Sequence, residues 1–236
     1  MFDLRFAGLF SGGKDSVSSI LRSVRQGHEL RCVIIIHPKD DESLLYHYPN
    51  HHILAKVAGA IGVPIIEIKC EKNDKESEVD NLYNGINQAI NQFQVKGLCH
   101  GCIHSEFQMN IFRKVVEKFN LKLLSPLWKI DTEIYYNTLF KDNFEIILTR
   151  VAANGLDKTW LGKTITPITL RDLRNLSNKF GFNLDFEGGE AETLVMSCPL
   201  YKKRIVTKAS KSQWDGIRGI FEISDVELIE IKRSNA

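Results

Sequence analysis

The sequence lacks the features that would place it in a specialised class of protein. No apolar stretch approaches the length of a membrane span, and no signal peptide precedes the first motif. The five cysteines are scattered and odd in number, which favours reduced thiols over a disulfide framework. The formal net charge of +2 argues against an extended nucleic-acid footprint. We therefore expect a globular cytoplasmic protein that binds neither membranes nor nucleic acids stably.

What the chain does contain is an unusual hexapeptide, S-G-G-K-D-S, at residues 11–16. It follows an apolar run, residues 4–10, that predicts a strand, and a helix is expected to begin at Asp15 or Ser16. Adjacent glycines let backbone N–H groups approach an anion, and a helix N-terminus adds unpaired N–H groups and partial positive charge. With two hydroxyls, an ammonium and a carboxylate, the hexapeptide predicts a nucleotide site. The alternative is a Gly-Gly turn with ordinary helix N-caps.

In the first half of the chain, short apolar runs alternate with amphipathic stretches. The runs predict strands at residues 4–10, 30–36, 65–68, 95–99 and 121–124, and the stretches predict helices at 50–61, 76–93 and 105–119. This alternation predicts an α/β fold with a Rossmann-like parallel sheet that is covered on both faces. Ligands of such sheets bind beyond the carboxyl ends of the strands, so the loops after Phe10, Ile36, Ile68 and Cys99 are expected to share one rim.

From about residue 125 the pattern changes, after a break at Pro126-Leu127-Trp128. Helices are predicted at residues 132–140 and 169–180, and strands at 144–151, 193–196, 205–207 and 221–231. We predict an ATP-binding domain at residues 1–124 and a smaller α+β substrate-binding domain at residues 125–236.

A second unusual string, E-G-G-E-A-E-T, occupies residues 187–193. Its two glycines allow close approach of a ligand, and its three carboxylates could bind a cation, an ammonium group or a metal-linked phosphate. An exposed acidic hairpin turn would have the same composition. The string alone leaves both interpretations open.

The order of motifs along the chain is more specific than any one of them. The hexapeptide resembles the pyrophosphate loop of the N-type ATP pyrophosphatases, whose fold is of the adenine nucleotide alpha hydrolase type. Further motifs follow at residues 46–50 (Y-H-Y-P-N), 101–108, 126–128 (P-L-W), 155–162, 188–193 and 198–201 (C-P-L-Y). Together they resemble the diphthine–ammonia ligase family over nearly the whole chain. The chain departs from that family's pattern at Met109, Ile111, Phe186 and Ala191.

This resemblance implies ATP-dependent amidation of diphthine on elongation factor 2 with ammonium, through an acyl-adenylate, to give diphthamide, AMP and pyrophosphate. It implies ATP and Mg²⁺ as cofactors, with Asp15 as the metal ligand. The expected catalytic residues are Lys14, Asp15 and Glu190. The expected ATP contacts are Ser11, Gly12, Gly13, Lys14, Asp15, Ser16, Ile36 and His37. The expected substrate contacts are His47, Ser105, Gln108, Glu187, Gly188, Gly189, Glu190, Glu192 and Thr193.

Two other functions fit part of the sequence. A tRNA-thiolating enzyme could share the loop, and Cys99 and Cys102 form a C-x-x-C pair that could carry persulfide or bind a cluster. Two buried thiols at the end of a strand are the plain alternative. A nucleotide sensor without catalysis could also share the loop, although it would not need Lys14 and Asp15 to handle a leaving pyrophosphate.

Overall fold

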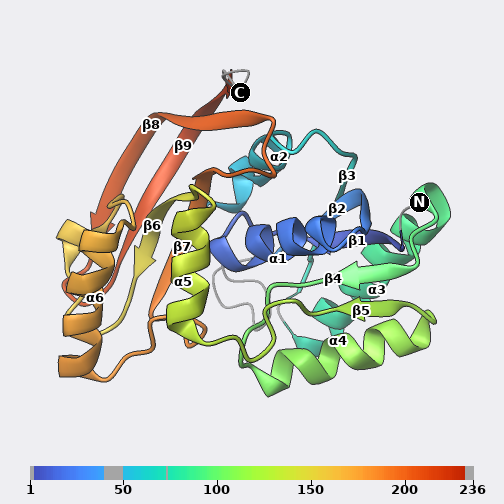
Figure 1. Ribbon diagram of the computed structural model, residues 1–236, viewed down its shortest axis with the longest axis horizontal. Coiled ribbons are helices and arrows are strands. Elements are labelled where there is room, and N and C mark those ends of the chain that lie inside the picture. The colour runs from blue at the N-terminus through green and yellow to red at the C-terminus, as the bar shows by residue number, and fades with distance from the viewer. Residues whose placement is uncertain (1–2, 40–49, 73, 232–236) are drawn as a thin grey trace.

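The computed structural model describes residues 3–39, 50–72 and 74–231, which form two sheets with helices around them (Figure 1). The first sheet is parallel throughout, with the strand order β3-β2-β1-β4-β5. Its strands are β1 (Arg5–Leu9), β2 (Glu29–His37), β3 (Ile65–Lys69), β4 (Gly97–Cys99) and β5 (Lys122–Leu124). This arrangement confirms the predicted Rossmann-like α/β fold.

Helices cover both faces of this sheet. Side chains alternate along each buried strand, so successive residues pack into cores on opposite faces. Val33 and Ile35 of β2 face a core shared with two helices, α1 (Lys14–Arg25) and α2 (Leu54–Ala58). Ile34 and Ile36 face a second core on the opposite side. That core is shared with α3 (Lys75–Phe93) and α4 (Glu106–Lys118).

The second sheet is antiparallel, with the strand order β7-β6-β9-β8. Its strands are β6 (Glu145–Val151), β7 (Ala191–Ser197), β8 (Lys203–Trp214) and β9 (Gly219–Glu230). Its helices are α5 (Thr132–Lys141) and α6 (Pro167–Phe180), with short 3₁₀ turns at η1 (His51–Ile53) and η2 (Lys158–Trp160) elsewhere in the chain. In Figure 1, α5 lies between the first sheet and α6. One apolar core runs from the α1 face of the first sheet into the second sheet.

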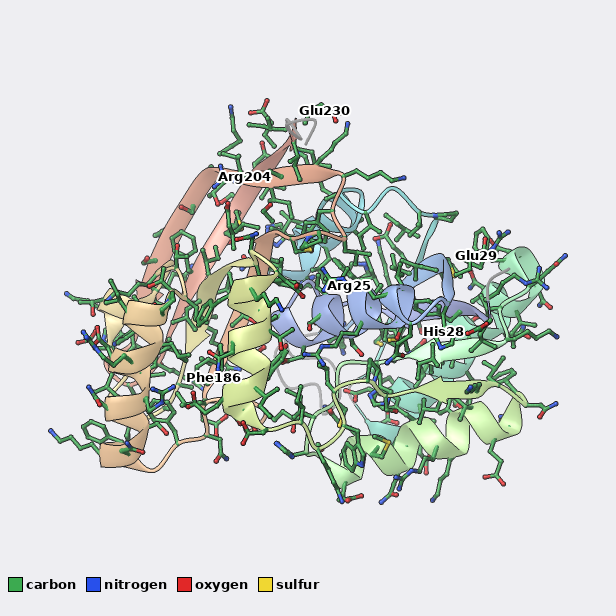
Figure 2. All side chains as sticks on the ribbon, viewed as in Figure 1. Arg25, His28, Glu29, Phe186, Arg204 and Glu230 are labelled. Atoms are coloured by element: carbon green, nitrogen blue, oxygen red, sulfur yellow. The ribbon has the colours of Figure 1, made fainter. Side chains whose placement is uncertain are left out.

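Two predicted elements differ clearly from the structure in length. The helix expected at 50–61 is a 3₁₀ turn followed by a helix that ends at Ala58. Strand β8 extends well beyond the predicted 205–207, since it pairs along its whole length with β9. Ion pairs such as Arg204–Glu145 (2.6 Å) stabilise this exposed region, where Figure 2 shows charged side chains pointing outward. Of the helices that the structure describes, none is both long and apolar enough to cross a membrane.

Asn50, the first residue of the helix predicted at 50–61, forms hydrogen bonds with the second sheet. Its side-chain amide donates to the Phe221 carbonyl (3.1 Å), and its carbonyl oxygen accepts from the Ile223 N–H (2.8 Å). The buried amide thus pairs with β9 as another strand would. Asn50 therefore ties the region before α2 to the second sheet.

The strand order fixes where a ligand can enter. β1 and β4 are neighbours, but the chain leaves β1 towards α1 on one face and leaves β4 towards α4 on the other. The two loops therefore diverge beyond the carboxyl ends of these strands. Such a switch point is where open α/β sheets bind their ligands.

Candidate active site

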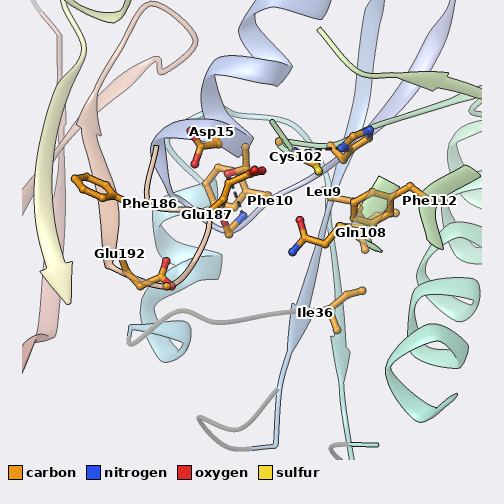
Figure 3. A pocket seen from close by; sticks show the side chains of 16 residues that line it. Leu9, Phe10, Asp15, Ile36, Cys102, Gln108, Phe112, Phe186, Glu187 and Glu192 are labelled. Atoms are coloured by element: carbon orange, nitrogen blue, oxygen red, sulfur yellow. Dashed lines mark hydrogen bonds between the residues drawn. The ribbon is translucent and has the colours of Figure 1, made fainter. Parts of the chain in front are cut away.

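A cavity of about 210 Å³ lies at this switch point (Figure 3). Four stretches of the chain line it: β1 with the loop after it, the end of β2, the region from the end of β4 into α4, and the segment before β7. The lining residues are Leu9, Phe10, Ser11, Asp15, Ser16, Ile34, Ile36, His100, Gly101, Cys102, Gln108, Phe112, Phe186, Glu187, Gly189 and Glu192. Residues after Phe10 and after Cys99 line the cavity, as predicted, and Ile36 lines it from β2. Among the described residues, none from the loops after Ile36 and Ile68 belongs to this lining.

The two ends of the cavity differ in polarity. Figure 3 shows Ile36, Gln108 and Phe112 towards one end, and Asp15 and Glu192 towards the other. The first end offers apolar side chains with one amide, which suits a flat heterocycle. The second end offers carboxylates, which suit cations or metal-linked phosphates.

The S-G-G-K-D-S loop forms a tight turn that is held by β7. Gly12 has φ +74°, a conformation that L side chains rarely adopt, and its carbonyl accepts from the Val195 N–H (2.9 Å). α1 begins at Lys14, one residue earlier than predicted, with Gly13 as its N-cap. The hydroxyls of Ser11 and Ser16 lie 3.1 Å apart. The first turn of α1, with its partial positive charge, therefore lies beside two hydroxyls, as anion binding requires.

Lys14 and Asp15 form a buried pair at the back of this loop. The Lys14 ammonium lies 2.9 Å from both Asp15 carboxylate oxygens and donates to the Asp185 carbonyl (2.6 Å). The Tyr135 hydroxyl donates to Asp15 Oδ1 (2.7 Å). Lys14 is fully buried, whereas Asp15 lines the cavity. Asp15 is therefore the member of the pair that can meet a ligand directly.

The loop after β4 packs against the start of α1. A Cβ atom at Gly101 would lie 2.6 Å from the Ser16 backbone nitrogen, so only glycine fits there. The neighbouring His100 is buried, accepts from the Cys102 N–H through Nδ1 (3.1 Å), and places Nε2 2.7 Å from Ser125 Oγ. Burial lowers the pKa of His100 to about 4. His100 is thus a neutral hydrogen-bonding residue in the cavity wall.

The acidic segment is part of the cavity and is not an exposed hairpin turn. The Glu187 carboxylate accepts from the backbone N–H groups of Ile103 and His104, each at 2.5 Å. Glu192 lines the cavity on β7, and burial raises its pKa to about 8, against the lowering effect of Arg150 and Lys14. A carboxyl with that pKa can exchange protons near neutral pH.

Comparison with known proteins now adds to this geometry. The family models described as the diphthamide synthase N-terminal and C-terminal domains match residues 4–123 and 131–229. The chain belongs to the diphthamide synthase family. Diphthine–ammonia ligase from Danio rerio is 32% identical over 227 residues, which cover 89% of this chain and 88% of that protein. The Rattus norvegicus protein of the same name is 31% identical over 231 residues, covering 89% and 85%.

Two further comparisons differ from these in the share of the other protein that is covered or in sequence identity. Diphthine–ammonia ligase from Schizosaccharomyces pombe is 32% identical over 218 residues, which cover 86% of this chain but 36% of that longer protein. A solved structure titled as a predicted subunit of tRNA methyltransferase from Methanocaldococcus jannaschii superposes with a TM-score of 0.40 and 14% identity, covering 84% of this chain and 98% of that one.

In this diphthamide synthase family member, the expected site residues divide into two groups. Those in the cavity wall are Ser11, Asp15, Ser16, Ile36, Gln108, Glu187, Gly189 and Glu192. The other described ones, outside the wall, are Gly12, Gly13, Lys14, His37, Ser105, Gly188, Glu190 and Thr193. His47 lies outside the described residues.

Several residues of the second group form hydrogen bonds near the cavity wall without lining it. Thr193 accepts the Lys14 N–H through Oγ1 (3.1 Å), and Ser105 caps α4. Glu190 accepts from the Asn183 N–H (3.2 Å), and His37 lies 2.9 Å from the Glu67 carboxylate. The catalytic role of Glu190 stays a prediction.

The thiols of Cys99 and Cys102 are buried and protonated. Burial raises their pKa to about 11 and about 12, and Cys99 Sγ lies 3.3 Å from the hydroxyls of Ser19 and Ser23. A persulfide carrier needs an accessible thiolate. Among the described residues, no group of three or more His, Cys, Asp or Glu could hold a metal ion. The tRNA-thiolation alternative is therefore not favoured, in agreement with the family.

Sequence reasoning missed Tyr135 and Asp185 entirely. Tyr135 lies on an amphipathic helix among core positions, so its spacing indicates packing and not contact with Asp15. Asp185 contributes a backbone carbonyl to Lys14, which no side-chain pattern can reveal.

Proposed function

We propose that this chain uses ATP to convert the carboxylate of diphthine into an amide with ammonium, giving diphthamide, AMP and pyrophosphate. The family and the printed names of its relatives support this activity. The observation that carries it is the cavity itself. There the S-G-G-K-D-S loop meets the acidic segment, and the Lys14–Thr193 bond joins residues that are 179 positions apart.

The chemistry requires activation of the acceptor. A carboxylate resists ammonia because oxide is a poor leaving group. A carboxylate oxygen of the acceptor attacks the α-phosphorus of ATP, the bond to the β-phosphate breaks, and pyrophosphate leaves. Ammonia then attacks the carbonyl carbon of the acyl-adenylate, AMP departs with the electron pair of the carbon–oxygen bond, and the nitrogen releases one proton to solvent to give the amide.

The residues at the polar end suit this sequence of steps. The N–H groups of the first turn of α1 and the hydroxyls of Ser11 and Ser16 would hold the departing pyrophosphate. The ionised form of Glu192 would accept a proton from ammonium, so that ammonia becomes the nucleophile. The apolar end, with Ile36 and Phe112, would hold the adenine. Catalysis here is positioning and charge stabilisation.

We also propose that Mg²⁺ takes part. Asp15 supplies the hard oxygen ligand that Mg²⁺ prefers, and phosphates and water commonly complete its coordination. The donor set therefore fits the ion. When bound, Mg²⁺ would neutralise phosphate charge. Lys14 contributes by holding Asp15 in place.

The finer assignments follow from the same activity. We propose elongation factor 2 bearing diphthine as the protein substrate, free ammonium as the nitrogen source, and the cytoplasm as the location. We further propose that residues 1–124 bind ATP and that residues 125–236 present the acceptor, since each range contains one of the two sheets. His47 stays a predicted acceptor contact.

A direct assay tests the proposal. The purified chain is incubated with ATP, ammonium and diphthine-bearing elongation factor 2. We expect AMP together with a loss of about one mass unit from the acceptor, as OH becomes NH₂. Formation of ADP would contradict α,β-cleavage, and AMP without the mass change would contradict the acceptor. Asp15→Asn should abolish AMP formation, while the exposed control Asp172→Asn on α6 should not change it.

A further inference from the structure

Tyr135 reaches the nucleotide loop from the other half of the chain. It lies on α5, is 0% exposed, and donates its hydroxyl hydrogen to Asp15 Oδ1 at 2.7 Å. Its ring centroid is 5.8 Å from the Lys14 ammonium, which holds both Asp15 oxygens at 2.9 Å. Asp15 is thus fixed by two buried side chains, although 28% of its own side chain is exposed.

The hydrogen bonds from the described residues leave one acceptor position of the Asp15 carboxylate unoccupied. An ionised carboxylate offers about four acceptor positions, two on each oxygen. Lys14 occupies one on each oxygen, and Tyr135 occupies the second on Oδ1. The acceptor position that remains unoccupied is on Oδ2. Rotation of the carboxylate would break these bonds, so the ligand-binding oxygen keeps its direction.

We propose that Tyr135 is a positioning residue that acts through Asp15, fixing the carboxylate in the orientation that meets the phosphates and metal of MgATP. The inference rests on the proposed use of ATP, but it does not depend on diphthine as the acceptor. Helix α5 is then part of the nucleotide site, because it carries the Tyr135 hydroxyl that completes the hydrogen bonds of Asp15.

The chain provides a matched control at the next residue. Tyr136 is also buried on α5, and its hydroxyl donates to the Leu184 carbonyl (2.8 Å) and not to Asp15. The two rings lie 5.9 Å apart. Tyr135→Phe and Tyr136→Phe therefore each remove one buried hydroxyl from the same helix, and only Tyr135→Phe removes a bond to Asp15.

The experiment measures MgATP affinity by calorimetry, without any acceptor, together with the melting temperature. We expect both variants to melt at similarly reduced temperatures. We expect Tyr135→Phe to weaken MgATP binding about tenfold, the size of one hydrogen bond to a charged group, and Tyr136→Phe to change it less than about twofold. In the Asp15→Asn background, Tyr135→Phe should change the affinity less than about twofold, because the two residues act as one unit.

Three results would overturn the inference. Equal MgATP affinity of the two single variants would show a purely structural role. A tenfold effect of Tyr135→Phe that persists in the Asp15→Asn background would show that Tyr135 does not act through Asp15. Absence of MgATP binding by the unmodified chain would overturn both this inference and the proposed function, whereas MgATP binding without diphthine amidation would remove only the latter.

Discussion

Gly101→Ala tests whether the cavity depends on the close approach of two loops. A Cβ at this position would lie 2.6 Å from the Ser16 nitrogen and 2.7 Å from the Asp15 carbonyl carbon. Both atoms belong to the backbone of the first turn of α1, so neither can rotate away. Moving from 2.6 Å to the 3.4 Å of ordinary van der Waals contact requires a shift of about 0.8 Å.

This shift has two consequences of different size. Overpacking of a dense interior costs about 1–3 kcal/mol in the free energy of unfolding. A misplacement of about 1 Å among reacting groups costs about a hundredfold in rate. We therefore expect Gly101→Ala to lose about 1–3 kcal/mol of stability and about a hundredfold in kcat/KM for AMP formation.

Gly97→Ala is the matched control. Gly97 is the first residue of β4, and Gly101 lies just after the end of that strand. Its added Cβ would lie 2.6 Å from Leu4 Cδ2, the end of a flexible side chain, and 3.1 Å from the Lys122 carbonyl oxygen, and Gly97 begins β4 whereas the cavity lining begins at His100, after that strand. Urea unfolding and the AMP assay should show a stability loss for both variants and a loss of turnover for Gly101→Ala alone. Ordinary turnover by Gly101→Ala, or equal loss of turnover by both variants, would refute the reasoning.

Three further predictions concern stability. The folded state holds the Glu192 proton up to about pH 8, against 4.5 for a free carboxyl, so Glu192 should make the free energy of unfolding fall as pH rises through that window. Glu192→Gln should remove this slope in urea titrations at several pH values; parallel slopes would contradict it. Asn50→Ala leaves two backbone groups of β9 unpaired and should cost about 2 kcal/mol or more in urea unfolding, while His52→Ala, which removes one bond to Ile223, should cost less. Glu187→Gln should cost about 1.5–3 kcal/mol and speed hydrogen exchange at the N–H groups of residues 103 and 104, and unchanged exchange would be evidence against their bonds to Glu187.

Local patterns were sufficient to predict the first sheet. The β-branched run in β2 and the glycine-rich turn after β1 are signals within a few residues, and they agree with the final structure. The long β8–β9 hairpin was predicted only in part, because its exposed end is polar and its pairing is not visible in either strand alone. The hydrogen bonds of Asn50 to β9 could not be predicted for the same reason, since its partners lie more than 170 positions away.

The site was predicted where residue type alone carries the chemistry. Asp15, Glu187 and Glu192 line one cavity, as their motifs suggested. The sequence could not show that Lys14 would be buried behind Asp15, because that depends on Tyr135 and on the Asp185 carbonyl. Residues that act through backbone atoms or from a packed helix leave no compositional signal.

The core that runs from the first sheet into the second has a consequence for the growing chain on the ribosome. Phe6 and Val17 share that core with Leu194 and Val226, so part of the core on the α1 face stays exposed until the later residues emerge. The carbonyl of Gly12 and the N–H of Lys14 likewise gain their hydrogen-bond partners only when Val195 and Thr193 have been synthesised. An unfinished chain thus has no completed nucleotide loop. We therefore expect ATP turnover only from chains that contain the second sheet.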